Sequence, residues 1–168
     1  MLPLFAIGPE PLDAGALAAA VVARHETTAR TAGRPSPGAV STFLGLVRDQ
    51  HEGRRVERLE YEAFDALALR SFERIAAEAS QAWPEVVLGI HHRTGAVAIG
   101  EASVVVVAAS AHRAEACGAS RYGIERIKQI SPIWKREYFA GGHVWVEGAT
   151  ADPDDTEARA EALARSCR

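Results

Sequence analysis

Lysine is nearly absent from this 168-residue sequence, although basic residues as a class are not. Lys128 and Lys135 are the only lysines among 19 basic residues, and the other 17 are arginines. Biased codon usage explains a preference for arginine, but it does not explain why both lysines lie within one eight-residue stretch. Because arginine stays protonated and lysine does not have to, the pair is a candidate for chemistry that arginine cannot perform.

Features typical of membrane, secreted and nucleic-acid-binding proteins are also lacking. The apolar segment 102–109 is far shorter than the ~20 residues that a membrane-spanning helix needs. The sequence does not begin with a basic segment followed by an apolar one, so no secretory signal is expected. The net charge of −3 differs from the basic surplus of nucleic-acid-binding proteins. We therefore expect a cytoplasmic protein without a membrane or nucleic-acid partner.

Cysteine and histidine are too few and too scattered to predict a disulfide or a metal site. Cys117 falls in a predicted helix and Cys167 lies beside the C-terminus, so no disulfide between them is expected. His91 and His92 are adjacent on a predicted strand, where consecutive side chains point to opposite faces and cannot chelate one ion. The sequence therefore predicts no structural metal and no bound cofactor.

What the sequence does contain is the pattern of one α+β domain. Its length suits a single domain, and 48% hydrophobic and 24% charged residues are ordinary globular values. Alternating and β-branched segments predict strands at 2–7, 38–47, 56–63, 86–92, 102–109, 133–139 and 143–147. Capped or apolar-periodic segments predict helices at 13–24, 65–83 and 112–130, the last two being the main long helices, with Asp13 and Ser110 as N-caps.

The segments between these elements are predicted to be irregular. Residues 26–37 are typical of a loop, and the polar segment 48–55 is typical of a mobile connection. The strand at 102–109 is apolar on both faces, so we expect it at the centre of a mostly antiparallel sheet. We expect one domain over residues 1–150, followed by an acidic C-terminal helix or tail at 151–168.

Common catalytic signatures are missing: there is no G-x-S-x-G elbow, phosphate-binding loop or dinucleotide fingerprint. Between Ser110 and Ala140, however, six basic residues oppose three glutamates, a surplus that suits an anionic ligand or partner tail. His112 and Arg113 open a predicted helix, where free backbone N–H groups and the positive end of the dipole favour an anion. The alternative is a helix start that happens to contain two polar residues.

Lys128 and Lys135 flank the predicted helix break at Ser131-Pro132, so this turn can bring the two amines together. The pKa of an amine falls beside a second positive charge, and an amine tuned in this way serves as a nucleophile or an acid–base group. The alternative is a pair of solvated lysines beside a turn. Arg48, which follows the strand at 38–47, is a third candidate because strand ends that lead into loops often contact ligands.

Five motifs occur in order along residues 38–147. They are Gly38-Ala-Val-Ser-Thr-Phe-Leu-Gly-Leu-Val-Arg48, Leu59-Glu-Tyr-Glu62, Gly100-Glu-Ala-Ser103, Ala111-His-Arg-Ala-Glu-Ala116 and Pro132-Ile-Trp-Lys-Arg-Glu137. Together they resemble the large, catalytic subunit of molybdopterin synthase. The resemblance implies an α/β hammerhead fold and a sulfurtransferase that converts cyclic pyranopterin monophosphate (precursor Z) to molybdopterin. It also implies that two sulfurs arrive on the C-terminal Gly-Gly thiocarboxylate of a small ubiquitin-like carrier subunit.

The resemblance further implies an assembly and a set of site residues. The large subunit is expected to form a homodimer with one carrier at each end, which makes a heterotetramer. Lys128 and Lys135 match the family's two active-site lysines. The expected substrate contacts are Phe43, Leu46, Val47, Arg48, His112, Arg113, Arg136 and Glu137.

Spacing along the chain separates these residues into two groups. His112 and Lys128 are 16 residues apart, which on one straight helix is ~24 Å at ~1.5 Å per residue. A small pterin cannot bridge that distance, so we expect a site shared across a homodimer, with His112 and Arg113 of one chain beside the two lysines of the other. Two alternatives are a non-catalytic module that binds a pterin or carrier protein, and a Schiff-base lyase that uses Lys128.

Overall fold

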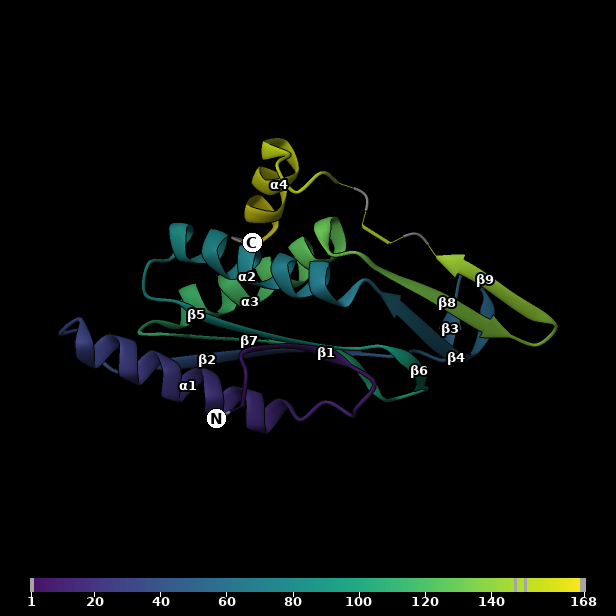
Figure 1. The fold of residues 1–168 in the computed structure, drawn as a ribbon, viewed down its shortest axis with the longest axis horizontal. Helices are drawn as coiled ribbons and strands as arrows, with labels where there is room; N and C mark the ends of the chain where they lie inside the picture. Colours follow the sequence, from purple (N-terminus) through teal and green to yellow (C-terminus); the bar gives the residue numbers. More distant parts are fainter. Residues whose placement is uncertain (1, 147, 150, 167–168) are drawn as a thin grey trace.

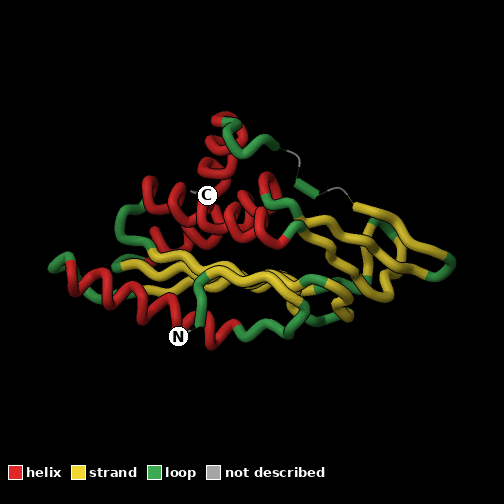
Figure 2. The backbone as a smooth tube through the Cα atoms, in the orientation of Figure 1, coloured by secondary structure: helices red, strands yellow, loops and turns green. Residues whose placement is uncertain are grey.

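Two β-sheets meet at the end of a layer of helices (Figure 1, Figure 2). The computed structural model describes residues 2–146, 148–149 and 151–166. Its strands are β1 (Phe5–Gly8), β2 (Ala39–Leu46), β3 (Gln50–His51), β4 (Arg54–Ala63), β5 (Val87–Arg93), β6 (Gly95–Ala98), β7 (Ala102–Ser110), β8 (Ile133–Phe139) and β9 (Gly142–Val146). Its helices are α1 (Ala14–Thr31), α2 (Asp65–Ala82), α3 (Arg113–Ile130) and α4 (Thr156–Ser166).

The four-stranded sheet has the order β1-β5-β7-β2 and is antiparallel except for the parallel pair of β1 and β5. β7 lies between β5 and β2, which confirms the central position expected for this strand. α1 covers one face of the sheet, and α2 and α3 cover the other (Figure 1). Val105 and Val107 therefore pack toward α1, while Val104 and Val106 pack toward α2 and α3. The predicted α+β class with a mostly antiparallel sheet is confirmed.

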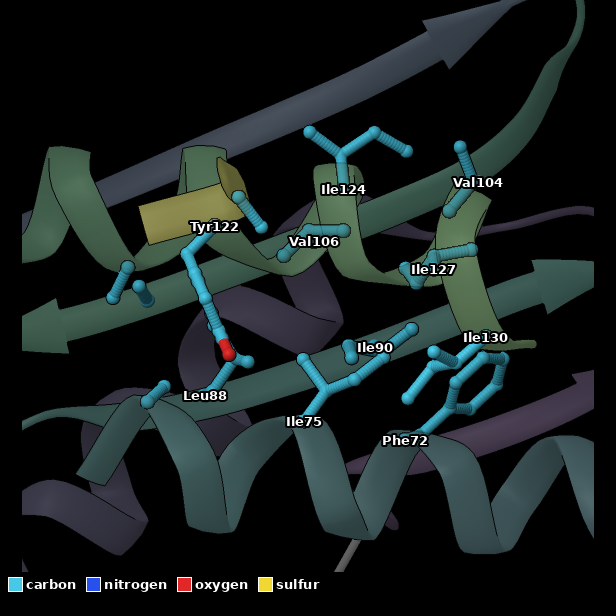
Figure 3. Close-up of a cluster of buried hydrophobic side chains, with 14 of the residues drawn as sticks. Phe72, Ile75, Leu88, Ile90, Val104, Val106, Tyr122, Ile124, Ile127 and Ile130 are labelled. Carbon is cyan, nitrogen blue, oxygen red and sulfur yellow. The ribbon is translucent and has the colours of Figure 1, made fainter. Parts of the chain in front are cut away.

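The main hydrophobic core lies between this sheet and the α2–α3 layer (Figure 3). α3 approaches its neighbours closely because it carries two glycines. A Cβ atom at Gly118 would lie 2.9 Å from the ring of Trp83, and one at Gly123 would lie 2.8 Å from a methyl group of Val106. α3 is nevertheless one uninterrupted helix, so close packing offsets the low helix propensity of glycine.

The second sheet has the order β3-β4-β8-β9, with β6 also paired to β4, and extends beyond the helices (Figure 1). β4 and β8 are antiparallel, with Tyr61 opposite Lys135 and Leu59 opposite Glu137. Since directly opposed residues in such a pair share a face, these four side chains lie on one side of the sheet. Arg136, between the two on β8, points to the other side.

The first helix is longer than the sequence predicted. α1 continues to Thr31 instead of ending near residue 24, so much of the expected loop at 26–37 is helical and the fold has three long helices, not two. The hydroxyls of Thr27, Thr28 and Thr31 each donate to the carbonyl four residues earlier, which accommodates threonine within the helix. Asp13 caps this helix as expected, by accepting a hydrogen bond from the amide of Ala16.

Three local predictions near the site are also corrected. Residues 48–55 are not an irregular connection, because β3 and the start of β4 form a hairpin whose two turn residues, Glu52 and Gly53, both have positive φ. The segment between the strands predicted at 86–92 and 102–109 contains the short strand β6, which the sequence did not predict. Ser110 does not cap α3: it ends β7 and donates to the carboxylate of Glu115, while His112 occupies the N-cap position.

The acidic C-terminal segment contains α4, which packs on α3 and inserts the fully buried Ala162 into the main core. Cys117 is an exposed free thiol on α3, and Cys167 lies outside the described residues. None of the described helices is long and apolar enough to cross a bilayer.

A buried ion pair joins the two helices that cover the main core. The guanidinium of Arg126, fully buried on α3, donates at 2.9 and 3.0 Å to both carboxylate oxygens of Glu78 on α2. Burial raises the pKa of Glu78, but hydrogen bonds from Arg126, Tyr122 and Arg74 outweigh it and hold the pKa below its usual value. Glu78 therefore stays charged and binds α2 to α3.

Replacing Arg126 with methionine should lower the free energy of unfolding by about 3–5 kcal/mol, because it leaves the buried Glu78 carboxylate without its main partner. Urea unfolding at neutral pH measures the change. Arg121→Met on the same helix is the matched control, since its exposed pair with Glu125 is worth about 0.5 kcal/mol or less. The deficit of Arg126→Met should shrink as the pH falls through the lowered pKa of Glu78, and equal losses in both variants would contradict the account.

Candidate active site

One cavity of about 590 Å³ lies where the two sheets and the C-terminal end of α3 come together. Five of the ten site residues predicted from the sequence line it: Phe43, Leu46, Arg48, Lys128 and Lys135. Its floor is apolar and includes Val104, Ile124 and Ile127, the side chains at the edge of the main core (Figure 3). Ligand pockets of enzymes have similar sizes, about 300–1,000 Å³, so the cavity accommodates a small molecule.

The turn between α3 and β8 brings the two lysines to this cavity. Lys128 lies in the last turn of α3 and Lys135 is the third residue of β8. The chain changes direction at Ser131-Pro132, where the hydroxyl of Ser131 is 2.7 Å from the hydroxyl of Ser71 in a buried hydrogen bond to α2. The turn predicted from the helix break therefore has the consequence expected of it, which is that both amines line one site.

The two amines have different surroundings. The ammonium of Lys135 lies 3.0 Å from one carboxylate oxygen of Glu137, and Nδ1 of His51 lies 2.8 Å from the other. A carboxylate only accepts, so Nδ1 of His51 carries the proton of that hydrogen bond. Burial raises the pKa of Glu137, but hydrogen bonds from Lys135 and His51 outweigh it and keep the pKa below its usual value. Lys128, by contrast, forms no ion pair within the described part of the chain.

Three further polar side chains, those of Tyr61, His92 and Ser103, line the cavity and were not predicted as site residues. Tyr61 of β4 and His92 of β5 meet edge to face, with ring centroids 5.1 Å apart. Burial raises the pKa of Tyr61, a hydrogen bond with Ser103 opposes this, and the charge of Glu137 adds to the increase. Alternation along each strand could have placed Tyr61 with Leu59 and His92 with Ile90 on inward faces. His51, in a two-residue strand, gave no such signal.

The remaining predicted residues lie outside the main cavity. His112 and Arg113 are at the opposite end of α3 from Lys128. Val47 is buried, exchanges backbone hydrogen bonds with Gly100 and Glu101, and lines a neighbouring cavity together with Arg48.

Glu137 and Arg136 lie on opposite faces of β8. Glu137 lines a smaller cavity of about 130 Å³, and Lys135 lines both this cavity and the main one. Arg136 pairs with Glu62 at 2.9 Å and stacks over the ring of Trp145 at 4.2 Å. Among the described residues, no three His, Cys, Asp or Glu side chains are arranged to hold a metal ion.

Comparison with known proteins identifies this arrangement. The family model of the MoaE protein matches residues 9–130. The chain is 46% identical over 109 residues to the molybdopterin synthase catalytic subunit of Bacillus subtilis, a match that covers 65% of this chain and 69% of that protein. Its structure matches the crystal structure of molybdopterin synthase from Staphylococcus aureus with a TM-score of 0.78 and 33% identity, covering 88% of this chain and 99% of the other.

A more distant match, at 24% identity, is a chain from the protein–protein complex of subunits 1 and 2 of the molybdopterin-converting factor of Helicobacter pylori. Its TM-score of 0.67, over 91% of this chain and 98% of that one, shows a shared fold. The curated relative and the solved structure define the class of protein as an enzyme of molybdopterin synthesis. The chain belongs to the MoaE protein family, which confirms the resemblance carried by the five motifs and the expected enzyme class, a molybdopterin synthase catalytic subunit.

Proposed function

We propose that the chain converts cyclic pyranopterin monophosphate to molybdopterin by inserting two sulfurs that a small ubiquitin-like carrier delivers as a C-terminal thiocarboxylate. The observation that carries this proposal is the single cavity lined by Lys128, Lys135 and Arg48. Among its described lining residues there is no aspartate or glutamate. Of these three cations only Lys135 has a carboxylate partner among the described residues, so the lining suits a ligand phosphate and a thiocarboxylate.

The position of Cys117 is consistent with imported sulfur. The Cys117 thiol is exposed on α3 and is not among the residues that line the cavity. The amines, rather than a thiol, are therefore the reactive groups that the described part of the chain presents to a ligand. In this proposal they act on the carrier's terminal carbonyl or as acid–base groups during transfer.

The lysine environments support a division of roles. The ammonium nitrogen of Lys135 lies 3.0 Å from a carboxylate oxygen of the negatively charged Glu137. Lys135 therefore serves as a fixed ammonium that binds and neutralises negative charge. Lys128 has no such partner among the described residues and lies against the apolar floor of Ile124 and Ile127. Lys128 is therefore the amine proposed to act as nucleophile or base, with Lys135 as its electrostatic companion.

The edge strand β2 supports a site shared across a homodimer. β2 begins beside Ser110, two residues before His112, and ends at Leu46 in the lysine-lined cavity. Its eight residues span about 27 Å at ~3.4 Å per residue, close to the length of α3 between His112 and Lys128. Antiparallel contact between two copies of β2 would place the start of one strand beside the end of the other. His112 and Arg113 of one protomer would then reach the partner's cavity.

The surface of β2 is suited to such a contact. Val40, Leu44 and Leu46 are 45%, 44% and 52% exposed, an unusual concentration of apolar side chains on an edge strand. A two-fold interface uses the same patch on both protomers, and this strand supplies one. The partner's helix N-terminus with Arg113 is then the proposed binding site for the pterin phosphate.

Reconstitution tests the proposed function against the non-catalytic binding module. The chain, a thiocarboxylated carrier and precursor Z are combined anaerobically, and the dithiolene product is assayed. We expect product with the thiocarboxylate and none with the ordinary carboxylate form of the carrier. Binding of both ligands without product would favour the module, and reduction by borohydride of an adduct between Lys128 and a carbonyl substrate without any carrier would favour the lyase.

Substitution of each lysine by arginine tests the division of roles. Lys128→Arg should lower the rate of dithiolene formation by about 10²–10⁴-fold, because arginine keeps the charge but cannot act as a nucleophile or base. Lys135→Arg should retain most of the rate, since a fixed cation beside Glu137 suffices. Single-turnover rates at saturating carrier give the comparison. Equal losses in both variants, or a larger loss in Lys135→Arg, would contradict the assignment.

Mixing two inactive variants tests the shared site. His112→Ala and Lys128→Ala should each abolish most activity alone, whereas mixed dimers contain one intact site made from the unaltered residue of each protomer. After unfolding and refolding an equal mixture, we expect about one quarter of the wild-type rate, since half of the dimers are mixed and each has one intact site. No recovery, although subunit exchange is demonstrated by differently tagged protomers, would show that both residues act within one chain.

A further inference from the structure

His92 is a buried histidine whose side chain faces the lysine-lined cavity. It lies on β5 and points to the same face of the sheet as Leu88 and Ile90, the face covered by α2 and α3. Only 6% of its surface is exposed, and it lines the cavity. His91, the preceding residue, points to the opposite face, where its Nε2 is 2.8 Å from the carbonyl oxygen of Pro3. The two adjacent histidines therefore have different environments, and only His92 is a lining residue of the cavity.

The hydrogen bond at one ring nitrogen fixes what the other can do. Nδ1 of His92 is 2.7 Å from the carbonyl oxygen of Arg93. A carbonyl only accepts, so Nδ1 carries the hydrogen. Burial lowers the pKa of His92 to about 4, with the Arg93 carbonyl opposing the shift, so the ring is neutral at physiological pH. In this tautomer Nε2 is a hydrogen-bond acceptor.

Nε2 has no hydrogen-bond partner among the described residues. His92 lines the cavity, whereas the two ring nitrogens of His25 are buried without a hydrogen-bond partner. Of the neighbouring hydroxyls, Ser103 donates to the carbonyl of Gly45. Interaction with Ser103 also opposes the increase that burial causes in the pKa of Tyr61. Nε2 of His92 is therefore an acceptor without a partner in the described lining of a cavity whose lysine and arginine side chains only donate.

We propose that Nε2 of His92 accepts a hydrogen bond from a ring N–H or amino group of the bound pterin, which makes His92 a specificity-determining residue. This inference rests on the proposed function and adds the contact that recognises the ring. Lysine and arginine side chains only donate, so they bind the anionic groups of the ligands but cannot recognise the N–H edge of a pterin. A neutral acceptor does so without adding a negative charge beside the phosphate.

Removing the acceptor while keeping a ring tests the inference. His92→Phe preserves the edge-to-face contact with Tyr61 but leaves the pterin N–H without a partner, so the Kd for precursor Z should rise about tenfold or more. His91→Phe, on the other face of the same strand, is the matched control and should bind as wild type does. Anaerobic titration calorimetry on the full chain gives each Kd. Equal affinity in His92→Phe and wild type would overturn the inference.

A second measurement on the unaltered protein decides the matter if His92→Phe fails to fold. The ¹⁵N resonance of Nε2 in the wild-type ring should move in the direction of hydrogen-bond acceptance when precursor Z is added, while Nδ1 keeps its hydrogen. An unchanged Nε2 resonance in a protein that binds precursor Z would refute the contact but leave the proposed function intact. Failure of the wild type to bind precursor Z would refute the proposed function, and this inference with it.

Discussion

The turn at Ser131-Pro132 is the constraint on which the rest of the structure depends. It ends α3, starts β8 and so connects the helical layer to the second sheet. The buried hydroxyl pair of Ser71 and Ser131 fixes this turn against α2, and the Arg126–Glu78 ion pair fixes α3 against the same helix. Because this junction is fixed, Lys128 before it and Lys135 after it both line one cavity.

The positive charges around the cavity lie in its lining, and the negative charge of Glu137 lies outside that lining. The cations line the cavity, and the carboxylate that accompanies Lys135 lies behind that lysine, in contact with the hairpin residue His51. An anionic ligand therefore meets positive charge directly, while the protein keeps the buried Glu137 satisfied by two donors. The neutral ring of His92 supplies an acceptor, which the lysine and arginine side chains of the lining cannot. These features suit a ligand that is anionic at one end and carries N–H donors at the other.

Much of this arrangement could be predicted from local sequence patterns. The apolar segment 102–109 correctly indicated the central strand, and the helix break indicated that the two lysines line one cavity. α1 was predicted too short because its threonines form hydrogen bonds with their own helix, which composition does not reveal. β3 and β6 were missed because strands of two and four residues are defined by their partner β4. Alternation along β8 could have separated Arg136 from Lys135, whereas the free acceptor on His92 depends on a backbone carbonyl known only from the fold.

The scarcity of lysine makes the central claim directly measurable, because protein labelled with ¹³C-lysine gives one Cε signal from Lys128 and one from Lys135. The account predicts that anaerobic addition of precursor Z shifts both signals with the same saturation curve, since both amines line one cavity. A shift of only one signal, or of neither while precursor Z is demonstrably bound, would contradict the claim that the two lysines form a single active site.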